Sequence, residues 1–300
     1  MDSVVVVGAS GYLGRHVVAS AAEAGREVHA VVRDRGRAEA PGPFGAPPLA
    51  GRPSSWVIGD VTDPDVAARA AARGDWVISA LGATGPGPGP WAVDFRGNLT
   101  VLDAALRQGV RRFTYTGVLG LDEGDPPLVR AKAAFAAVLR RSAVCAQVVN
   151  PSAFFSDLGL LLRSPLPQWV PGSPRDPRMS PIHGADLAEF ILTSLPDSAE
   201  GTWDVGGPET LRWSEVVALA GRVRGVRTRF LPIPASVGSA ASRLVRLVSP
   251  PAADGVDFLR WTLSRDQVGS PTGRHRLADF LDQEQRGRPR RGHPWHTVQR

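Results

Sequence analysis

The first fourteen residues of the chain constrain its fold more than any other stretch. Four consecutive valines over 4–7 predict a strand that is buried on both faces, and an Ala- and Val-rich helical pattern follows over 12–24. Between them stand Gly8, Gly11 and Gly14, at a spacing of three. In a strand, loop and helix of this kind the first glycine permits the tight turn, the second lets the backbone approach a pyrophosphate, and the third lets the helix pack closely on the strand. The stretch therefore predicts a dinucleotide-binding loop made of Gly8, Ser10, Gly11, Tyr12, Leu13 and Gly14.

Further strand signals alternate with helical patterns as far as residue 149. They cover 26–32, 56–59, 76–80, 111–116 and 144–149. Such alternation predicts right-handed crossovers and an α/β, Rossmann-like, doubly wound parallel sheet. A Pro- and Gly-rich stretch over 38–55 predicts a loop in place of the second crossover helix.

The pattern breaks into shorter pieces after residue 150. It predicts a helix opening at 182–188, a short strand at 202–205, a helix over 215–224 capped by Ser214, a strand over 227–231, and helices over 235–248 and 254–264. We expect an NAD(P)-binding domain over 1–150 and a smaller, mostly helical substrate cap over 151–285 that is interleaved with the sheet. A basic tail follows over 286–300.

Two residues at predicted strand ends suit the adenosine part of a cofactor. Arg33 lies nineteen residues beyond Gly14, where an arginine favours a 2′-phosphate and an acid would favour a free hydroxyl. We therefore predict NADP(H) in preference to NAD(H), with Arg15 either assisting or lying solvated on its helix. Asp60, followed by Val61, is placed to accept a hydrogen bond from the adenine amino group; its alternative role, a helix cap, suits Asp63 better.

Lys132 is the single lysine among 35 lysines and arginines. Either it was retained by chance, or the site needs a compact ammonium whose pKa can be tuned, which arginine does not provide. Ala80, Leu81 and Gly82 follow the fourth predicted strand, and Pro151 follows the sixth. Because ligands bind at the carboxyl ends of parallel strands, we expect these residues to line the nicotinamide side.

Composition excludes several other classes. The net charge is +6, but residues 286–300 hold five arginines and no acid, so the body is nearly neutral and no specific nucleic-acid binding is predicted. No apolar run reaches the roughly 18 residues of a transmembrane helix, which favours a cytoplasmic protein. Cys145 is the only cysteine, so neither an intrachain disulfide nor a cysteine zinc site is expected, and no metal is predicted.

Taken together, the 8–14 loop, the Asp60–Val61 pair, Leu81–Gly82, Lys132 and the Pro151–Phe155 turn resemble the extended and atypical short-chain dehydrogenase/reductases. The NmrA-like and complex I accessory-subunit-like branch is the most similar, and the resemblance covers about residues 1–210. It implies a Rossmann fold, an NAD(P) cofactor and a catalytic role for Lys132.

The chain departs from that family at two catalytic positions. A tyrosine four residues before the lysine is the usual acid in the family, and here Leu128 stands there; Gly117 stands at the serine position. Tyr115 and Thr116 are weaker substitutes. Some members similar to isoflavone reductase are thought to use lysine as the main catalytic residue, which implies that Lys132 holds the nicotinamide ribose and presents positive charge or a relayed proton.

These features lead to an NADPH-dependent reductase of a small, apolar carbonyl, enone or quinone-type substrate, and a homodimer is compatible with it. The competing hypotheses are an NADP(H)-binding regulatory sensor without turnover, and an assembly subunit that keeps the cofactor for stability. His183, at a helix start beside Asp186, is interpreted as structural. The apolar residues of 237–248 predict a helix that packs on the domain or closes over substrate, with membrane-surface binding as the alternative.

Overall fold

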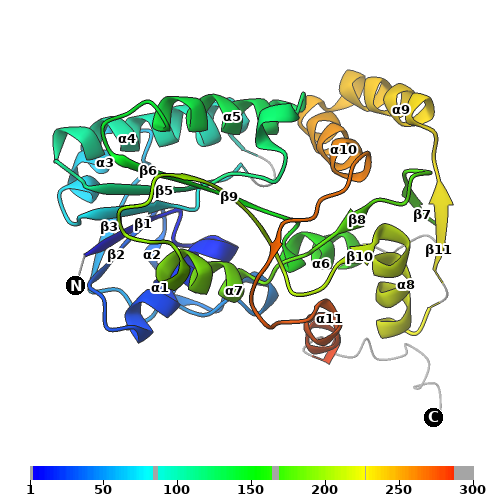
Figure 1. The fold of residues 1–300 in the computed structure, drawn as a ribbon, viewed down its shortest axis with the longest axis horizontal. Coiled ribbons are helices and arrows are strands. Elements are labelled where there is room, and N and C mark those ends of the chain that lie inside the picture. The colour runs from blue at the N-terminus through cyan, green and yellow to red at the C-terminus, as the bar shows by residue number, and fades with distance from the viewer. Residues whose placement is uncertain (1–2, 84–86, 164–168, 227, 287–300) are drawn as a thin grey trace, which may run out of the picture.

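A computed structural model of the chain describes residues 3–83, 87–163, 169–226 and 228–286. Its centre is an eight-stranded sheet in the order β12-β9-β6-β5-β4-β1-β2-β3, in which all neighbouring strands are parallel (Figure 1). The strands are β1 Val4–Val7, β2 Val28–Val32, β3 Ser55–Ile58, β4 Trp76–Ser79, β5 Arg112–Thr116, β6 Cys145–Pro151, β9 Gly201–Gly206 and β12 Ser270–Pro271. The strand order reverses direction at β1, so the predicted Rossmann-like, doubly wound α/β fold is confirmed.

Helices cover both faces of this sheet (Figure 1). In the first half they are α1 Tyr12–Glu23, α2 Arg35–Glu39, η1 Pro43–Gly45, α3 Pro64–Ala71, η2 Trp91–Gly97, α4 Asn98–Arg107, η3 Leu121–Glu123 and α5 Pro127–Leu139. The Pro- and Gly-rich stretch holds only the end of the short α2 and the single turn η1, close to the predicted loop.

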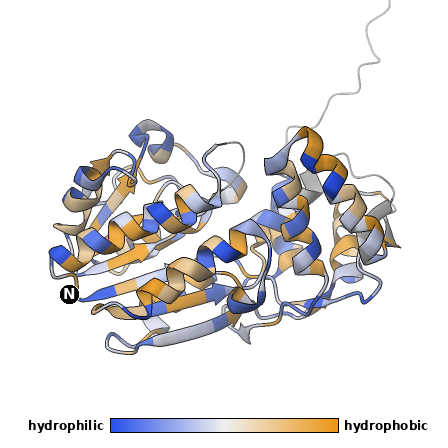
Figure 2. Ribbon diagram, turned by 90° about the horizontal axis from the view of Figure 1, so that it is seen from above, coloured by the Kyte–Doolittle hydropathy of each residue, from blue (hydrophilic) through white to orange (hydrophobic). Residues whose placement is uncertain are grey.

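Alternation along β1 divides the interior into two cores. All four valines of β1 are fully buried. Because successive side chains point to opposite faces, Val5 and Val7 join the core under α3, α4 and α5, whereas Val4 and Val6 join the core under α1 and α7 (Gly184–Glu189). In the hydropathy view the covering helices carry both hydrophilic and hydrophobic residues, as amphipathic helices do (Figure 2).

The second half of the chain both extends the sheet and builds a third core beside it. β9 pairs with β6 and β12 pairs with β9. The remaining elements are α6 Phe155–Arg163, β7 Trp169–Gly172, β8 Arg178–Met179, η4 Phe190–Ser194, β10 Leu211–Arg212, α8 Trp213–Val223, β11 Arg229–Pro232, α9 Ala235–Val248, α10 Pro250–Leu263 and α11 Leu277–Arg286. Phe155, Trp213 and Phe280 belong to the third core, which α6, α8, α10 and α11 share.

One predicted helix cap is wrong. Ser214 lies inside the first turn of α8, which begins at Trp213. Its backbone N–H and its hydroxyl both donate to the carboxylate of Asp176, at 2.8 and 2.7 Å. The side chain that accepts hydrogen bonds at this helix start therefore comes from a residue 38 positions away along the chain.

The apolar face of α9 is exposed. α9 packs against α10, but Leu247 is 84% exposed and Val248 is 88% exposed, and Val237 and Leu244 are exposed as well. The expectation that these four side chains pack on the domain is therefore wrong, and Val245 is only half-buried. Within the described parts of the chain, no helix combines the length and hydrophobicity needed to cross a bilayer. Of the predicted tail, only Arg286 lies within the described residues.

Candidate functional site

The loop between β1 and α1 is shaped for close approach. Gly8 has a φ of 77°, and a Cβ there would lie 2.9 Å from the carbonyl oxygen of Ala80. A Cβ on Gly14 would overlap the carbonyl oxygen of Gly8. α1 begins after Gly11 with no side-chain cap and no acid in its first turn. The backbone N–H groups of Tyr12, Leu13 and Gly14 are therefore available to an anion, and this end of the helix dipole is positive, which fits a pyrophosphate.

Arg15 holds this loop through hydrogen bonds from its guanidinium to backbone carbonyl oxygens. Its side chain is 2% exposed, and its Nε donates to the carbonyl oxygen of Ser10 at 2.9 Å. Its other bonds go to the carbonyl oxygens of Arg37, Ala38, Ala40 and Pro47. Both sequence-based predictions for Arg15 are wrong, because it is neither solvated nor free to meet a phosphate. Burial lowers the pKa of its guanidinium.

Arg33 and Asp60 lie at the ends of the neighbouring strands β2 and β3. One carboxylate oxygen of Asp60 accepts from the backbone N–H and the hydroxyl of Thr62, at 2.9 and 2.8 Å. These bonds, and the positive charge of Arg33, lower the pKa of Asp60. The exposed Arg33 side chain makes no hydrogen bond or ion pair with another described residue. Asp63 caps α3 by accepting from the N–H of Asp65 at 2.9 Å, as the sequence suggested.

The loop after β4 is held by a carboxylate that sequence reasoning missed. Ala83 donates its backbone N–H to Asp94 at 3.0 Å, and Ala80, Leu81 and Gly82 precede it. Asp94 is fully buried on η2. A single Asp inside a helical stretch gives no local signal of this contact. Of the other predicted residues, Val61 and Pro151 are buried, so they would shape the site through backbone and packing.

Lys132 points into the same buried network. Its Nζ lies 3.0 Å from Oδ1 of Asp94 and donates to the carbonyl oxygen of Thr116 at 3.1 Å. Burial alone would lower the pKa of Lys132, but the neighbouring Tyr115 and Asp94 outweigh it and raise that pKa. The ammonium therefore stays protonated near neutral pH, and a carboxylate already neutralises its charge.

At the two positions where the chain departs from the family, 128 and 117, other side chains occupy the space. Leu128 is half-buried on α5. A Cβ on Gly117 would overlap Oδ1 of the buried Asn150, whose Nδ2 donates to Asp204 at 3.0 Å. Tyr115 is fully buried and packs edge-on against Phe135, with ring centroids 4.7 Å apart. Burial raises the pKa of the Tyr115 phenol, so it is a packed aromatic rather than an acid that meets substrate.

The side chain of Tyr12 turns away from the loop into a histidine cluster. Its phenol oxygen accepts from the N–H of Gly184 at 3.2 Å. Nearby, His183 stacks on His275 at 4.3 Å, and Asp186 binds Nδ1 of His275 at 2.6 Å. Nδ1 of His183 accepts from the N–H of Ala185 at the start of α7, which agrees with a structural role. Burial lowers the pKa of His183 to about 4.

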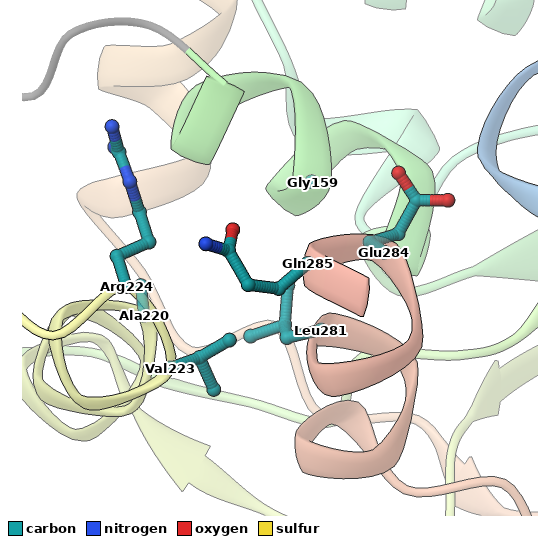
Figure 3. A pocket seen from close by; sticks show the side chains of 7 residues that line it. All are labelled: Gly159, Ala220, Val223, Arg224, Leu281, Glu284 and Gln285. Atoms are coloured by element: carbon teal, nitrogen blue, oxygen red, sulfur yellow. The ribbon is translucent and has the colours of Figure 1, made fainter. Parts of the chain in front are cut away.

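Two hollows near α11 do not resemble a nucleotide site. The crevice in Figure 3 lies between α6, α8 and α11, has an apolar floor of Ala220, Val223 and Leu281, and offers about 20 Å³. That volume holds a single water molecule. An open groove of about 440 Å³ is lined by His183, His275 and residues of α11, and neither Arg33 nor Asp60 lines it. Across the described residues, no group of three or more His, Cys, Asp or Glu side chains could hold a metal ion.

Comparison with known proteins places these features in context. The model of a family described as NAD(P)H-binding matches residues 8–198. A divinyl chlorophyllide a 8-vinyl-reductase of Zea mays is 30% identical over 256 residues, covering 78% of this chain and 62% of that enzyme. The photosystem II assembly factor Ycf39 of Cyanophora paradoxa is 24% identical over 240 residues, covering 77% of this chain and 72% of that protein. The chain therefore spans less than two thirds of the maize enzyme.

Solved structures show the same fold at low sequence identity. An NADPH-dependent quinone oxidoreductase from Escherichia coli, complexed with NADPH, superposes with a TM-score of 0.71 at 17% identity, covering 94% of this chain and 99% of that one. A triphenylmethane reductase from Citrobacter sp. gives a TM-score of 0.69 at 18% identity, covering 95% and 99%.

Proposed function

The chain belongs to the NAD(P)H-binding family, in the atypical, NmrA-like branch of the short-chain dehydrogenase/reductases, and we propose that it is an NADPH-dependent reductase of a small, apolar carbonyl, enone or quinone-type substrate. One observation carries the proposal. The glycine-lined, uncapped start of α1 lies at the carboxyl edge of the sheet, where open α/β folds bind ligands. Arg33 lies at the same edge and makes no ion pair with another described residue. When bound, a dihydronicotinamide supplies a hydride.

Each part of the cofactor has a group suited to it. The first-turn N–H groups of α1 would bind the pyrophosphate, with the Ser10 hydroxyl beside them. Asp60 would accept from the adenine amino group, since its lowered pKa keeps it ionised. Arg33 would bind a 2′-phosphate through charge-assisted hydrogen bonds, which is the reason for preferring NADP(H). The backbone of 80–82 and Pro151 would line the nicotinamide.

Lys132 acts in this proposal as a fixed charge. Asp94 and Thr116 take two of its N–H donors, and the phenol of Tyr115 also interacts with the ammonium. A ribose hydroxyl of the cofactor would share the third donor with Tyr115. The raised pKa of Lys132 speaks against a relayed proton. Through Asp94 it also fixes the N–H of Ala83, and with it the 80–83 loop.

The substrate class follows from the missing tyrosine. Leu128 cannot exchange a proton, so acceptors that need little help from an acid fit best, such as quinones and conjugated carbonyls. Two similar proteins, a vinyl-reductase and a quinone oxidoreductase, are named for activities of this class. A homodimer and a cytoplasmic location stay predictions from the sequence.

The proposal is tested by following NADPH absorbance with a panel of quinones and enones. We expect acceptor-dependent oxidation of NADPH that is slower with NADH at equal concentration. The Gly14→Ala variant is the control, because it should lose both binding and turnover. Wild-type protein that binds NADPH yet reduces no acceptor would contradict the reductase proposal.

That last outcome would support a second candidate, an NADP(H)-binding regulatory protein without turnover. A specific observation favours it: Leu128 and Asn150 fill the places of the family's tyrosine and serine. A sensor should change its protease sensitivity or its oligomeric state when NADPH replaces NADP⁺, whereas a reductase needs no such difference.

A further inference from the structure

The polar side of α9 faces the protein. Ser242 on α9 is 4% exposed and donates its hydroxyl hydrogen to Asp257 of α10 at 2.6 Å. Arg246 donates to Asp254 and to Asp257, at 2.9 and 2.7 Å. α10 in turn packs on α5, so these bonds fix the orientation of α9 on the molecule (Figure 1). A surface helix ordinarily packs through its apolar side, whereas α9 packs largely through its polar side.

The opposite side of α9 is a continuous apolar stripe. Its residues stand at spacings of three and four along the chain, which places them on one face of a helix. They are the exposed Val237, Ala240, Ala241, Leu244, Leu247 and Val248. Pro250, Pro251 and Ala252, at the start of α10, are exposed as well. A contiguous apolar surface of this kind marks a place where a partner or a membrane covers the protein.

A lipid surface fits this stripe better than a second copy of the chain. α9 has 14 residues, so it is about 21 Å long and about 10 Å wide and offers a footprint of roughly 200 Å². A stable protein interface buries about 800 Å² on each partner and is anchored by tryptophan, tyrosine and arginine. The stripe is aliphatic throughout and falls short of that area. Lipid chains are fluid, so they can cover a narrow aliphatic stripe without a matching surface.

Arg243 adds a positive charge at the border of the stripe, one helical turn before Leu247. It is exposed, and it makes no ion pair with another described residue. α9 contains no acidic residue, and both acids of α10, Asp254 and Asp257, are paired with arginines. An anionic lipid headgroup would therefore meet an unpaired guanidinium and no carboxylate on α9.

We propose that α9 docks the protein on the surface of an anionic lipid membrane. The helix lies parallel to the surface, with its apolar stripe among the upper parts of the acyl chains and Arg243 at the level of the headgroups. The hydrogen bonds to α10 already hold the stripe outward, so docking needs no rearrangement of the protein. This inference goes beyond the proposed reductase activity and does not depend on it.

The test is flotation of the full-length protein with lipid vesicles. We expect wild type to float with vesicles of phosphatidylcholine and phosphatidylglycerol in equal parts. The double variant Leu244→Ser with Leu247→Ser should lower the partition coefficient by roughly tenfold to hundredfold, because two apolar side chains leave the acyl region. Arg243→Gln should lower it by about fivefold on these vesicles and leave it unchanged on phosphatidylcholine alone.

Leu106→Ser is the matched control. Leu106 is an exposed leucine on α4, which lies far from α9 in Figure 1, and this variant should float as wild type does. The arginines of 286–300 are the same in every variant, so they do not contribute to the differences. All four side chains that are replaced are exposed, so the melting temperatures should match that of wild type.

Two results in flotation would overturn the proposal: wild type that stays in the aqueous fraction, and a double variant that floats as well as wild type. Sedimentation velocity without lipid provides the third test. Wild type and the double variant should have the same oligomeric state. A wild-type dimer that the double variant reduces to a monomer would also overturn the proposal, because a second copy of the chain would then cover the stripe.

Discussion

The phosphate loop, which is the proposed pyrophosphate site over residues 8–14, and the histidine cluster lie on either side of Tyr12, and they are built in opposite ways. The loop is a backbone site: its three glycines leave room for close approach, and the N–H groups of α1 face outward. The cluster is a side-chain site, in which His16, His183 and His275 meet from three distant segments. Backbone sites depend on local spacing and side-chain sites on tertiary packing, so the two should respond differently to substitution.

The largest change in the free energy of unfolding is expected at Lys132, whose side chain forms an ion pair with Asp94 in the first half of the chain. Lys132→Met leaves the fully buried Asp94 carboxylate without its cation. Removing one partner of a buried ion pair typically costs about 3–5 kcal/mol, so the free energy of unfolding in urea should fall by that amount.

The double variant Lys132→Met with Asp94→Leu provides the control. Apolar replacement of both partners is often close to neutral, so the double variant should recover most of the lost stability. A double variant as unstable as the single one would show that the pair does not act as a unit.

Gly14→Ala should break the backbone site. The added Cβ would overlap the carbonyl oxygen of Gly8 and lie 2.8 Å from Cα of Ala9, and both are backbone atoms that cannot swing away. We expect stability to fall by about 1–3 kcal/mol and NADPH binding to be lost in calorimetry.

Gly255→Ala on α10 is the matched comparison for Gly14→Ala. Nothing lies within 4 Å of its added Cβ, so helix propensity should raise stability by about 0.5–1 kcal/mol. Equal effects of the two alanines would contradict the close-approach account of the loop.

The sequence predicted the strand, turn and helix around the 8–14 loop well and the side-chain contacts poorly, for a physical reason. The valine strand, the glycine spacing and the helix of the loop are encoded within about twenty residues, and Arg33 and Asp60 follow from their positions at strand ends. Arg15 carries no local signal that four of its five hydrogen-bond partners lie more than twenty residues away along the chain. The same holds for Asp94.

The C-terminal half shows this limit at the level of whole elements. α6, β7, β8 and α11 were not predicted, because short elements that pack on one another lack a sustained hydrophobic period. Ser214 was predicted to cap α8, but the carboxylate of Asp176, which is distant in sequence, accepts the hydrogen bonds at that helix start. The hydrophobic periodicity of α9 likewise does not show whether another part of the protein covers its apolar side.

Acid should weaken the histidine cluster while leaving the loop intact. Burial lowers the pKa of His16 to about 3, below its usual 6.5 or so in the unfolded chain. The stability from keeping it neutral is present above pH 6.5 and is lost as pH falls toward 3, by up to about 1.4 kcal/mol per pH unit for each proton bound.

His16→Phe tests this pH dependence. The variant keeps a ring between Tyr12 and His183 but cannot take up a proton. Its melting temperature, followed by circular dichroism, should fall less than that of wild type between pH 6.5 and 4. Parallel curves for the two proteins would show that His16 does not titrate on unfolding.

The smallest effect is expected on α9. Leu247 is 84% exposed, so Leu247→Ser should change the free energy of unfolding by less than about 0.5 kcal/mol. Leu263, on α10 and 5% exposed, is the buried counterpart, and Leu263→Ala should cost about 2–5 kcal/mol. A large loss in Leu247→Ser would mean that its side chain is covered in solution.

Calorimetric titration with NADPH and NADH, on wild type and on Arg33→Ala, tests the central claim most directly. We expect wild type to bind NADPH about tenfold to hundredfold more tightly than NADH, and Arg33→Ala to remove that difference while leaving NADH affinity unchanged. Arg107→Ala, at an exposed arginine on α4, should behave as wild type. Equal affinity of wild type for the two nucleotides would contradict 2′-phosphate recognition by Arg33, and binding of neither would contradict a cofactor site at the phosphate loop.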